Sequence, residues 1–497
     1  MTTTTLADAL ADAATRTPDR VLIVDGGVQL DCRTLQQRAG ELAQVLMSRM
    51  PVGSVLSFML PNWHEAAVIY LGATLAGMVV NPILPSLREH DLRYILADCD
   101  SRMIFIPDNF RGHDYPAMLT SVCAHLPSPP DVVVVRGEQP LPEPPTTRLP
   151  LPTLDPNAVR MILYTSGTTG APKGVLHSHR SLGALIAQLH EYWSIDRGDT
   201  FLVPSPIAHI GGSIYAFECP LLLGTTALLM DRWDAAEAVT LMTRHHCTHM
   251  AGATPFLVNL LAAAEEAGTH LPDLKVFICG GASVSPQLIH SATSYFDNAM
   301  VTRVYGSTEV PVTTVGAPHH PDRAADTDGR PGIADIKLVD GEIRARGPQM
   351  LLGYLHPEDN TAGTFDADGY FCTGDLGRWT DDGYLVVTGR AKDLIIRNGE
   401  NISPKEIEDV LAGHPDIAEV AIVGIPDERT GERAVAVLVS QAPLTVAALG
   451  DYLTERGVAK FKMPEQVQIW DSLPKNDAGK VLKHRIRMEL AACQQHQ

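Results

Sequence analysis

The sequence has an excess of negative charge and lacks the segments that mark membrane or secreted proteins. Lysine and arginine number 39 against 58 acidic residues, a formal net charge of −19. This balance argues against non-specific binding of nucleic acid or of an anionic membrane surface. No stretch reaches about 18 consecutive apolar residues, so we expect no membrane span. The first 20 residues lack a basic region followed by an apolar one, so we expect no signal peptide.

Cysteine pairs at metal-binding or redox spacing are absent too. The eight cysteines contain no C-x-x-C pair, which favours reduced thiols in a cytoplasmic protein over a disulfide framework. Residues 244–249 read RHHCTH and put His245 and His249 four residues apart. On a helix such a pair could ligate zinc. No third or fourth ligand is evident, so we favour a structural role for this segment.

The bulk composition is that of a globular enzyme, with 45% hydrophobic and 20% charged residues. A chain of 497 residues allows two or three domains. Short apolar runs such as 21–24, 54–60 and 103–107 alternate with helical patterns such as 33–49 and 87–98. This alternation predicts an α/β fold with a parallel sheet. A β-rich segment follows at 333–390, and then a compact α/β unit whose boundary we place between Arg390 and Asp393.

Residues 164–174, YTSGTTGAPKG, are the most informative stretch. Hydroxyl and glycine residues disfavour a helix or strand interior, and a loop of N–H and O–H donors ending in Lys173 suits phosphate oxygens. Composition alone favours a flexible surface loop over a phosphate site. The stretch is neither a Walker A motif nor a G-x-G-x-x-G loop. As a whole it resembles the phosphate loop of the adenylate-forming enzymes, the superfamily of acyl-CoA synthetases, peptide-synthetase adenylation domains and firefly luciferase. The loop residues that this resemblance assigns to ATP are Thr165, Ser166, Gly167, Thr168 and Thr169.

Four further motifs of that superfamily follow in its order: YGSTE at 305–309, TGD at 373–375, GRAKD at 389–393 and PKNDAGK at 474–480. The resemblance implies that Tyr305 stacks on adenine, Thr308 meets the α-phosphate and Glu309 binds Mg²⁺. It likewise implies that Asp375 holds the ribose, Arg390 assists at the nucleotide, Lys392 is the hinge and Lys480 is the adenylation lysine. Taken singly, Glu309 and Lys480 are ordinary solvated surface charges.

Other positions match the superfamily less specifically. Gly280, Gly281 and Ala282 match a stretch that lines adenine and the acyl group, and His209 matches a position beside the acyl pocket. A buried, satisfied histidine is the alternative for His209. Gly306 replaces the tryptophan of acetate-type members, which suggests an acid larger than acetate. Residues 397–408, with Gly399, Glu400 and Asn401, resemble the loop that lines the CoA tunnel.

The resemblance implies an α/β protein with a large N-terminal domain of stacked sheets and a β-rich subdomain, residues 1–389, and a small mobile α+β C-terminal domain, residues 390–497. It implies a carboxylic acid–CoA ligase that uses ATP, Mg²⁺ and CoA, with a medium-chain, alicyclic or aromatic monoacid as substrate. Loading of a carrier protein is the runner-up, luciferase-like oxidation is more distant, and an inactive nucleotide-binding regulator is the alternative from another class. The sequence leaves a monomer and a homodimer open.

Overall fold

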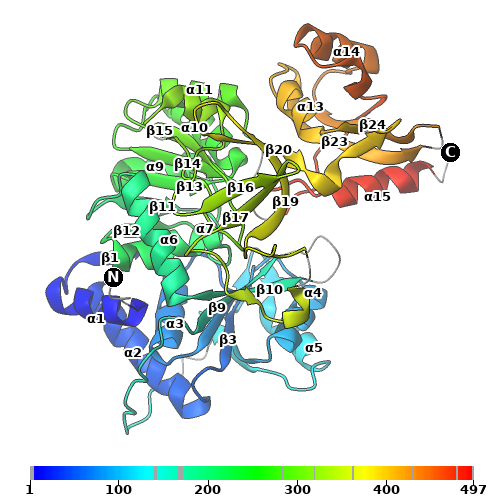
Figure 1. The fold of residues 1–497 in the computed structure, drawn as a ribbon. Helices are drawn as coiled ribbons and strands as arrows, with labels where there is room; N and C mark the ends of the chain where they lie inside the picture. The colour runs from blue at the N-terminus through cyan, green and yellow to red at the C-terminus, as the bar shows by residue number, and fades with distance from the viewer. Residues whose placement is uncertain are drawn as a thin grey trace.

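The computed structural model describes residues 5–138, 143–165, 172–281, 284–317, 319–360, 363–427, 429–476 and 479–494. The predictions for Ser166, Gly167, Thr168, Thr169 and Ala282 therefore lie outside the described residues. Figure 1 shows a large body, coloured blue to yellow, and a smaller orange-to-red body beside it. The fold class predicted from the sequence is confirmed.

Two seven-stranded sheets form the frame of the large body. The first has seven strands in spatial order, all parallel except for the β1–β2 hairpin: β15 (Met300–Val304), β14 (Val276–Gly280), β13 (His249–Gly252), β11 (Thr200–Val203), β12 (Thr226–Leu229), β1 (Val21–Asp25) and β2 (Val28–Asp31). Strands β1, β11, β12 and β14 are largely apolar, because helices cover both faces of a parallel sheet.

The second sheet carries the predicted phosphate loop. Its strands, in spatial order, are β18 (Gly353–Tyr354), β10 (Lys173–Ser178), β9 (Val159–Thr165), β4 (Val79–Pro82), β3 (Val55–Phe58), β5 (Ser101–Pro107) and β8 (Asp131–Val135). Strands β9 and β10 are antiparallel, with Thr165 opposite Lys173. The loop thus joins the two strands of one hairpin, and its flanking residues Thr165 and Lys173 are held in register by the sheet.

Helices pack on these sheets and between them. Those of the large body are α1 (Leu6–Arg16), α2 (Cys32–Arg49), α3 (His64–Leu75), α4 (Glu89–Asp98), α5 (Tyr115–Cys123), α6 (His179–Tyr192), α7 (Ile210–Ser213), the π-helix η1 (Ile214–Glu218), α8 (Cys219–Leu222), α9 (Ala235–Arg244), α10 (Thr254–Ala267), α11 (Pro286–Tyr295), α12 (Pro321–Asp326) and the 3₁₀ turn η2 (Pro357–Asp359). A short hairpin pairs β6 (Asn109–Phe110) with β7 (His113–Asp114). Several helices begin at a side-chain cap, such as Ser178 of α6, which accepts a hydrogen bond from Ser181 N.

A buried ion pair lies within the core of the large body. Arg160 on β9 and Glu218 at the end of η1 are 3% and 2% exposed, and Nη2 lies 2.7 Å from Oε1. The Tyr70 hydroxyl on α3 donates to the same carboxylate oxygen over 2.5 Å. Arg160, Glu218 and Tyr70 thus connect β9 with η1 and α3, and neither charge of the ion pair has access to bulk water.

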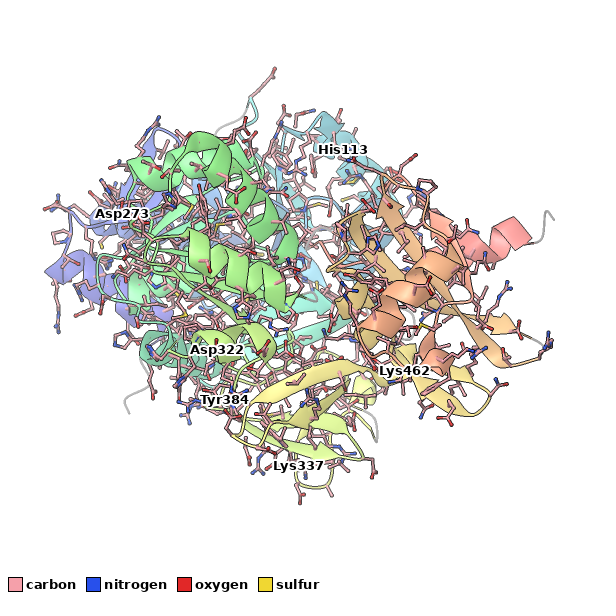
Figure 2. All side chains as sticks on the ribbon, turned by 90° about the horizontal axis from the view of Figure 1, so that it is seen from above. His113, Asp273, Asp322, Lys337, Tyr384 and Lys462 are labelled. Atoms are coloured by element: carbon pink, nitrogen blue, oxygen red, sulfur yellow. The ribbon has the colours of Figure 1, made fainter. Side chains whose placement is uncertain are left out.

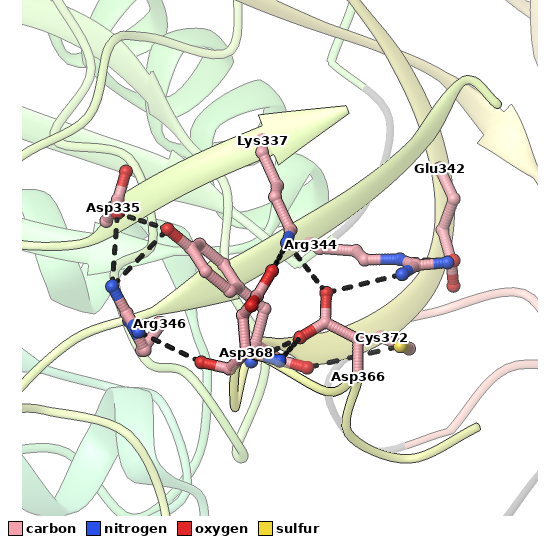
Figure 3. A network of polar contacts seen from close by, with 9 residues as sticks. Asp335, Lys337, Glu342, Arg344, Arg346, Asp366, Asp368 and Cys372 are labelled. Atoms are coloured by element: carbon pink, nitrogen blue, oxygen red, sulfur yellow. Dashed lines mark hydrogen bonds and ion pairs between the residues drawn. The ribbon is translucent and has the colours of Figure 1, made fainter. Parts of the chain in front are cut away.

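A four-stranded antiparallel sheet lies between the two bodies (Figure 1). Its strands are β16 (Asp335–Val339), β17 (Glu342–Arg346), β19 (Phe371–Trp379) and β20 (Leu385–Arg390). Figure 3 shows how the Asp366 carboxylate accepts contacts from Lys337 at 2.9 Å and Arg344 at 3.3 Å. These contacts tie the turn before β19 to β16 and β17, so the strand that carries Asp375 starts from a fixed position.

The small body has its own sheet and core. Its strands are β22 (Glu400–Ile402), β21 (Ile395–Arg397), β24 (Gly431–Ser440), β23 (Ile417–Asp427) and β25 (Gln466–Ile469), and its helices are α13 (Pro404–Leu411), α14 (Val446–Glu455), the turn η4 (Lys460–Lys462) and α15 (Lys483–Gln494). A single 3₁₀ turn, η3 (Ala391–Asp393), joins it to β20. Figure 2, seen from above, shows Lys462 on this body and Tyr384 in the turn that joins β19 to β20.

The RHHCTH segment has the structural role that we favoured and does not form a helical pair of histidines. Helix α9 ends at Arg244, and His249 begins the buried strand β13. The His249 ring stacks on Phe201 at 4.7 Å, and its Nε2 lies 3.0 Å from the Trp193 carbonyl oxygen. The i, i+4 spacing of His245 and His249 therefore does not correspond to a helix, because His249 packs into the sheet. In the core the His249 ring has a hydrogen-bond partner.

Two absences hold for the part of the chain that the structure describes. The seven cysteines with described side chains are all free. Within the described ranges, no helix combines the length and the apolar character that crossing a membrane requires.

Candidate active site

A cavity of about 410 Å³ opens between the large and the small body. Its lining joins residues from four of the five predicted motifs and from the adjoining glycine stretch: Gly281, Tyr305, Gly306, Asp375, Arg390 and Lys480. These residues are separated by up to two hundred positions along the chain. Their meeting in one cavity makes it the candidate active site.

Asp375 lies between Tyr305 and Arg390 at one end of the cavity. It is 6% exposed, and its two oxygens have different partners. The Tyr305 hydroxyl donates to Oδ2 over 2.8 Å, and Arg390 Nε lies 2.7 Å from Oδ1. The register of β19 and β20 puts Asp375 opposite Arg390, so the sheet itself sets this pair. Burial, and next the Asp375 charge, raises the pKa of Tyr305, which keeps the phenol a hydrogen-bond donor.

Lys480 enters the cavity on a tight turn of the small body. The Asn476 side chain accepts a hydrogen bond from Lys480 N over 2.8 Å, and Gly479 adopts φ +77°. A residue with a Cβ is strained at that angle. Gly479 also faces the large body, where a Cβ would lie 3.4 Å from Pro255 Cγ. The Asn and Gly of the motif therefore shape the turn that presents the lysine.

The ammonium group of Lys480 is crowded by protein from both bodies, although its surface stays open to the cavity solvent. The pKa of Lys480 is lowered to about 8. The larger cause is the loss of hydration on burial, and the second is the positive charge of the Arg390 guanidinium. Asp375 acts in the opposite direction. Lys480 and Arg390 thus bring two positive charges to the same cavity, and such a pair suits an anionic ligand.

A second group of predicted residues meets around Tyr354, which sequence reasoning missed. The Tyr354 hydroxyl donates to Glu309 Oε1 over 3.0 Å, and Lys173 Nζ lies 5.1 Å from the centre of its ring. Lys173 also pairs with Asp359 Oδ1 at 3.2 Å. Strand β18 places Tyr354 opposite Val175 of β10. No motif contained Tyr354 or Asp359, and only the pairing of β18 with β10 brings them to Lys173.

Thr308 is held through its backbone. Its carbonyl oxygen lies 2.8 Å from Nε2 of His177, a fully buried residue of β10. Burial lowers the pKa of His177 to about 4, so the ring is neutral at pH 7 and donates from Nε2 to this carbonyl. His177 thus fixes the YGSTE loop against the same strand that begins with Lys173.

The residues around Glu309 fit a Mg²⁺ ion. Glu309 is half-buried and its Oε1 has the Tyr354 hydroxyl as a partner. Mg²⁺ prefers oxygen ligands and is usually held by one or two carboxylates together with substrate phosphates and water. A single anchored carboxylate that shares its partner Tyr354 with Lys173 meets that requirement.

Several predicted residues lie outside the cavity lining. His209 caps the short helix α7, and its buried Nε2 has no hydrogen-bond partner among the described residues. Burial lowers its pKa, so the ring is neutral. Gly280 packs tightly, since a Cβ there would lie 2.6 Å from Val304 Cγ1. Gly306, in contrast, does line the cavity, and the structure gives it a further reason to be glycine, because a Cβ would lie 2.6 Å from Val312 N.

The predicted hinge and CoA residues lie on the small body's side of the boundary. Lys392 is in the turn η3, and burial, then Arg390, lowers its pKa. Gly399, Glu400 and Asn401 are exposed on the β21–β22 hairpin, where Gly399 has φ +83°. They do not contribute to the cavity in this arrangement. The pose therefore presents Lys480, and not the hairpin, to the large body.

Comparison with known proteins agrees with this arrangement. The family profile of the AMP-binding enzymes matches residues 10–355, and that of their C-terminal domain matches residues 406–480. The medium-chain fatty-acid–CoA ligase of Escherichia coli (strain K12) is 32% identical over 98% of this chain and 90% of its own length. An indenyl-propanoyl:CoA ligase of Rhodococcus jostii (strain RHA1) is 32% identical over 98% of this chain and 99% of its own length.

Among solved structures, ATP-bound MatB from Rhodopseudomonas palustris superposes with a TM-score of 0.85 at 27% identity, covering 97% of this chain and 98% of MatB. The profile, the relatives and the fold agree with the motif resemblance over nearly the whole chain. The chain therefore belongs to the AMP-binding enzymes, the adenylate-forming superfamily, as an AMP-forming acid–thiol ligase.

Proposed function

We propose that the chain is an ATP-dependent carboxylic acid–CoA ligase that works in two half-reactions. The observation that carries the proposal is the presence of Lys480 in one cavity with Tyr305, Asp375 and Arg390. In the first half-reaction a carboxylate oxygen attacks the α-phosphorus of ATP, a P–O bond forms, and pyrophosphate leaves with the electrons of the broken α–β bond. In the second, the CoA sulfur attacks the acyl carbon of the adenylate and AMP leaves.

The Asp375 end is proposed to bind the nucleoside. A carboxylate accepts two hydrogen bonds from a ribose diol, and Tyr305 offers an aromatic face to adenine. For the ribose to bind, Asp375 must share its oxygens with Tyr305 and Arg390, which already hold it in place. Asp375 would thus be oriented before the nucleotide arrives, which reduces the entropy cost of binding.

The Lys173 end is proposed to bind the phosphates. Lys173, Thr165, the loop residues Ser166 to Thr169, and Glu309 would face the β- and γ-phosphates, and Thr308 would face the α-phosphate. Mg²⁺, held by Glu309, would supply charge neutralisation on the phosphate oxygens. Lys480 would neutralise the charge that develops between the attacking carboxylate and the α-phosphate.

The second half-reaction is proposed to need a rotation of the small domain, residues 390–497, about Lys392 on the large domain, residues 1–389. The pose in the structure suits adenylation, because Lys480 faces the large domain and Gly399, Glu400 and Asn401 do not. Rotation would withdraw Lys480 and bring this hairpin to the cavity as one wall of the CoA path.

The acid is proposed to be a medium-chain, alicyclic or aromatic monoacid bound near His209, Gly280 and Gly306. The names of the two relatives, one a fatty-acid ligase and one a bicyclic propanoyl ligase, support this range. A neutral, buried His209 offers no countercharge for a second carboxylate. Catalysis in the cytoplasm is the setting that free cysteines and a CoA substrate favour.

The test is AMP release from Mg·ATP across a panel of carboxylic acids, with and without CoA. AMP formed only with both acid and CoA, together with the matching thioester mass, supports the ligase and names its substrate. Pyrophosphate release without CoA-dependent turnover points to a carrier-protein thiol. ATP binding without any acid-dependent exchange of pyrophosphate into ATP contradicts the proposal and indicates a regulatory binder.

A further inference from the structure

Lys173 has a carboxylate partner that the adenylation chemistry does not use. Its Nζ lies 3.2 Å from Asp359 Oδ1, and the two side chains are 25% and 30% exposed. The lysine also lies over the Tyr354 ring, at 5.1 Å from its centre. The lysine is therefore turned to a carboxylate, which offsets its charge.

The two partners differ in freedom of movement. Asp359 ends the 3₁₀ turn η2, which is anchored by His356, whose Nε2 pairs with Asp98 Oδ1 at 2.9 Å. The next residue, Asn360, accepts a hydrogen bond from Tyr354 N over 3.2 Å. Lys173 has its backbone fixed in β10 but carries a four-carbon chain with rotatable bonds. The lysine, and not the carboxylate, is the group able to leave the pair.

The ion pair between Lys173 and Asp359 is weak enough to be broken and formed again. Partly exposed ion pairs contribute little to stability because water screens them and side-chain entropy opposes them. A triphosphate with its several charged oxygens outcompetes one carboxylate for the same ammonium group.

We propose that Asp359 is a latch that competes with the β- and γ-phosphates for Lys173. Without nucleotide, Asp359 holds the lysine. When Mg·ATP binds, Lys173 transfers to the phosphates, and when pyrophosphate leaves, Asp359 recaptures it. Asp359 is thus a positioning residue that weakens the binding of ATP and of pyrophosphate and leaves AMP unaffected. The inference rests on the proposed role of Lys173 at the phosphates.

The test is isothermal titration calorimetry on the full chain with Mg·ATP, magnesium pyrophosphate and AMP. Asp359→Asn is expected to lower the Kd for Mg·ATP and for pyrophosphate by about two- to fivefold, the range of a partly exposed ion pair. The Kd for AMP is expected to stay unchanged. Raising the ionic strength is expected to narrow the difference, since screening weakens the competing pair. Asp359→Ser serves as a second variant.

Glu358→Gln is the matched control. It removes the same charge one residue away, from a side chain that is 77% exposed and lies 4.0 Å from His356 Nδ1. If general electrostatics caused the tighter binding, this variant would show it as well. In a Lys173→Ala background, Asp359→Asn is expected to change nothing, because the competing cation is gone.

Unchanged or weaker ATP binding in both Asp359 variants would overturn the latch, and weaker binding would mean that Asp359 holds Lys173 in place for the nucleotide. An equal tightening of AMP binding would also overturn it. The titrations contain neither acid nor CoA. If the chain ligates acids but Asp359→Asn leaves the Kd for Mg·ATP unchanged, only the latch is refuted. If Asp359→Asn lowers that Kd but the chain activates no acid, the latch is supported and the proposed ligase function is contradicted.

Discussion

Lys480→Ala is the substitution whose effect follows most directly from the site. Lys480 reaches the cavity from the small body, whereas Asp375 and Tyr305 belong to the large body. Arg390 does not replace it, because Arg390 Nε is engaged by Asp375 at 2.7 Å. Lys405, Lys475 and Lys483 also line the cavity, but each is paired with a carboxylate at 2.6–2.7 Å. None of the three is therefore free to replace Lys480 at the α-phosphate.

The expected loss is large in one half-reaction and small in the other. Removing one preorganised group that stabilises transition-state charge costs about 10² to 10³ in kcat, or about 3–4 kcal/mol. We expect that loss in acid-dependent exchange of pyrophosphate into ATP. Attack of CoA on preformed acyl-adenylate is expected to change by less than about threefold, because the proposed rotation of the small domain removes Lys480 from the cavity.

The assay measures the two half-reactions separately, with labelled pyrophosphate for the first and synthetic acyl-adenylate plus CoA for the second. Lys475→Ala is the control on the same loop, since Lys475 pairs with Glu419 at 2.7 Å. It is expected to keep both half-reactions within a few-fold of the unaltered chain. Equal losses of both half-reactions in Lys480→Ala would refute the two-pose reasoning, and so would a Lys475→Ala loss of the same size.

Three further predictions follow from the same structure. With a pKa lowered to about 8 in the free enzyme, Lys480 is protonated below that pH and loses its charge above it. The kcat/KM for adenylation should therefore be flat below pH 8 and fall up to about tenfold per pH unit above it, and a profile flat to pH 10 would contradict this. Asp375→Asn should raise the Kd for both ATP and AMP by about tenfold, since the ribose partner and the Tyr305 anchor weaken together; an unchanged AMP titration would contradict it. Glu218→Gln should lower the free energy of unfolding in urea by about 3–5 kcal/mol, because it leaves Arg160 buried and uncompensated; a loss below about 1 kcal/mol would show that water reaches Arg160.

The sequence by itself was sufficient where a motif specifies local backbone. The PKNDAGK motif contains Asn476 and Gly479, the two residues that shape the tight turn before Lys480. The alternation of short apolar strands with helices predicted the α/β fold, because a strand that is buried on both faces is apolar along its length. The motif order also predicted which residues share a site, and Tyr305, Asp375, Arg390 and Lys480 meet in one cavity.

Only the tertiary structure decided the contacts that depend on strand register and packing between distant segments. Tyr354 reaches Glu309 and Asp359 reaches Lys173 because β18 pairs with β10, and neither residue carries a local signal. The same holds for His249, whose spacing suggested a helix while sheet packing made it a core residue. A motif determines the backbone conformation of a few neighbouring residues. The partner of a side chain depends instead on how distant strands and helices pack when the whole chain buries its apolar surface, and a short stretch of sequence does not contain that information.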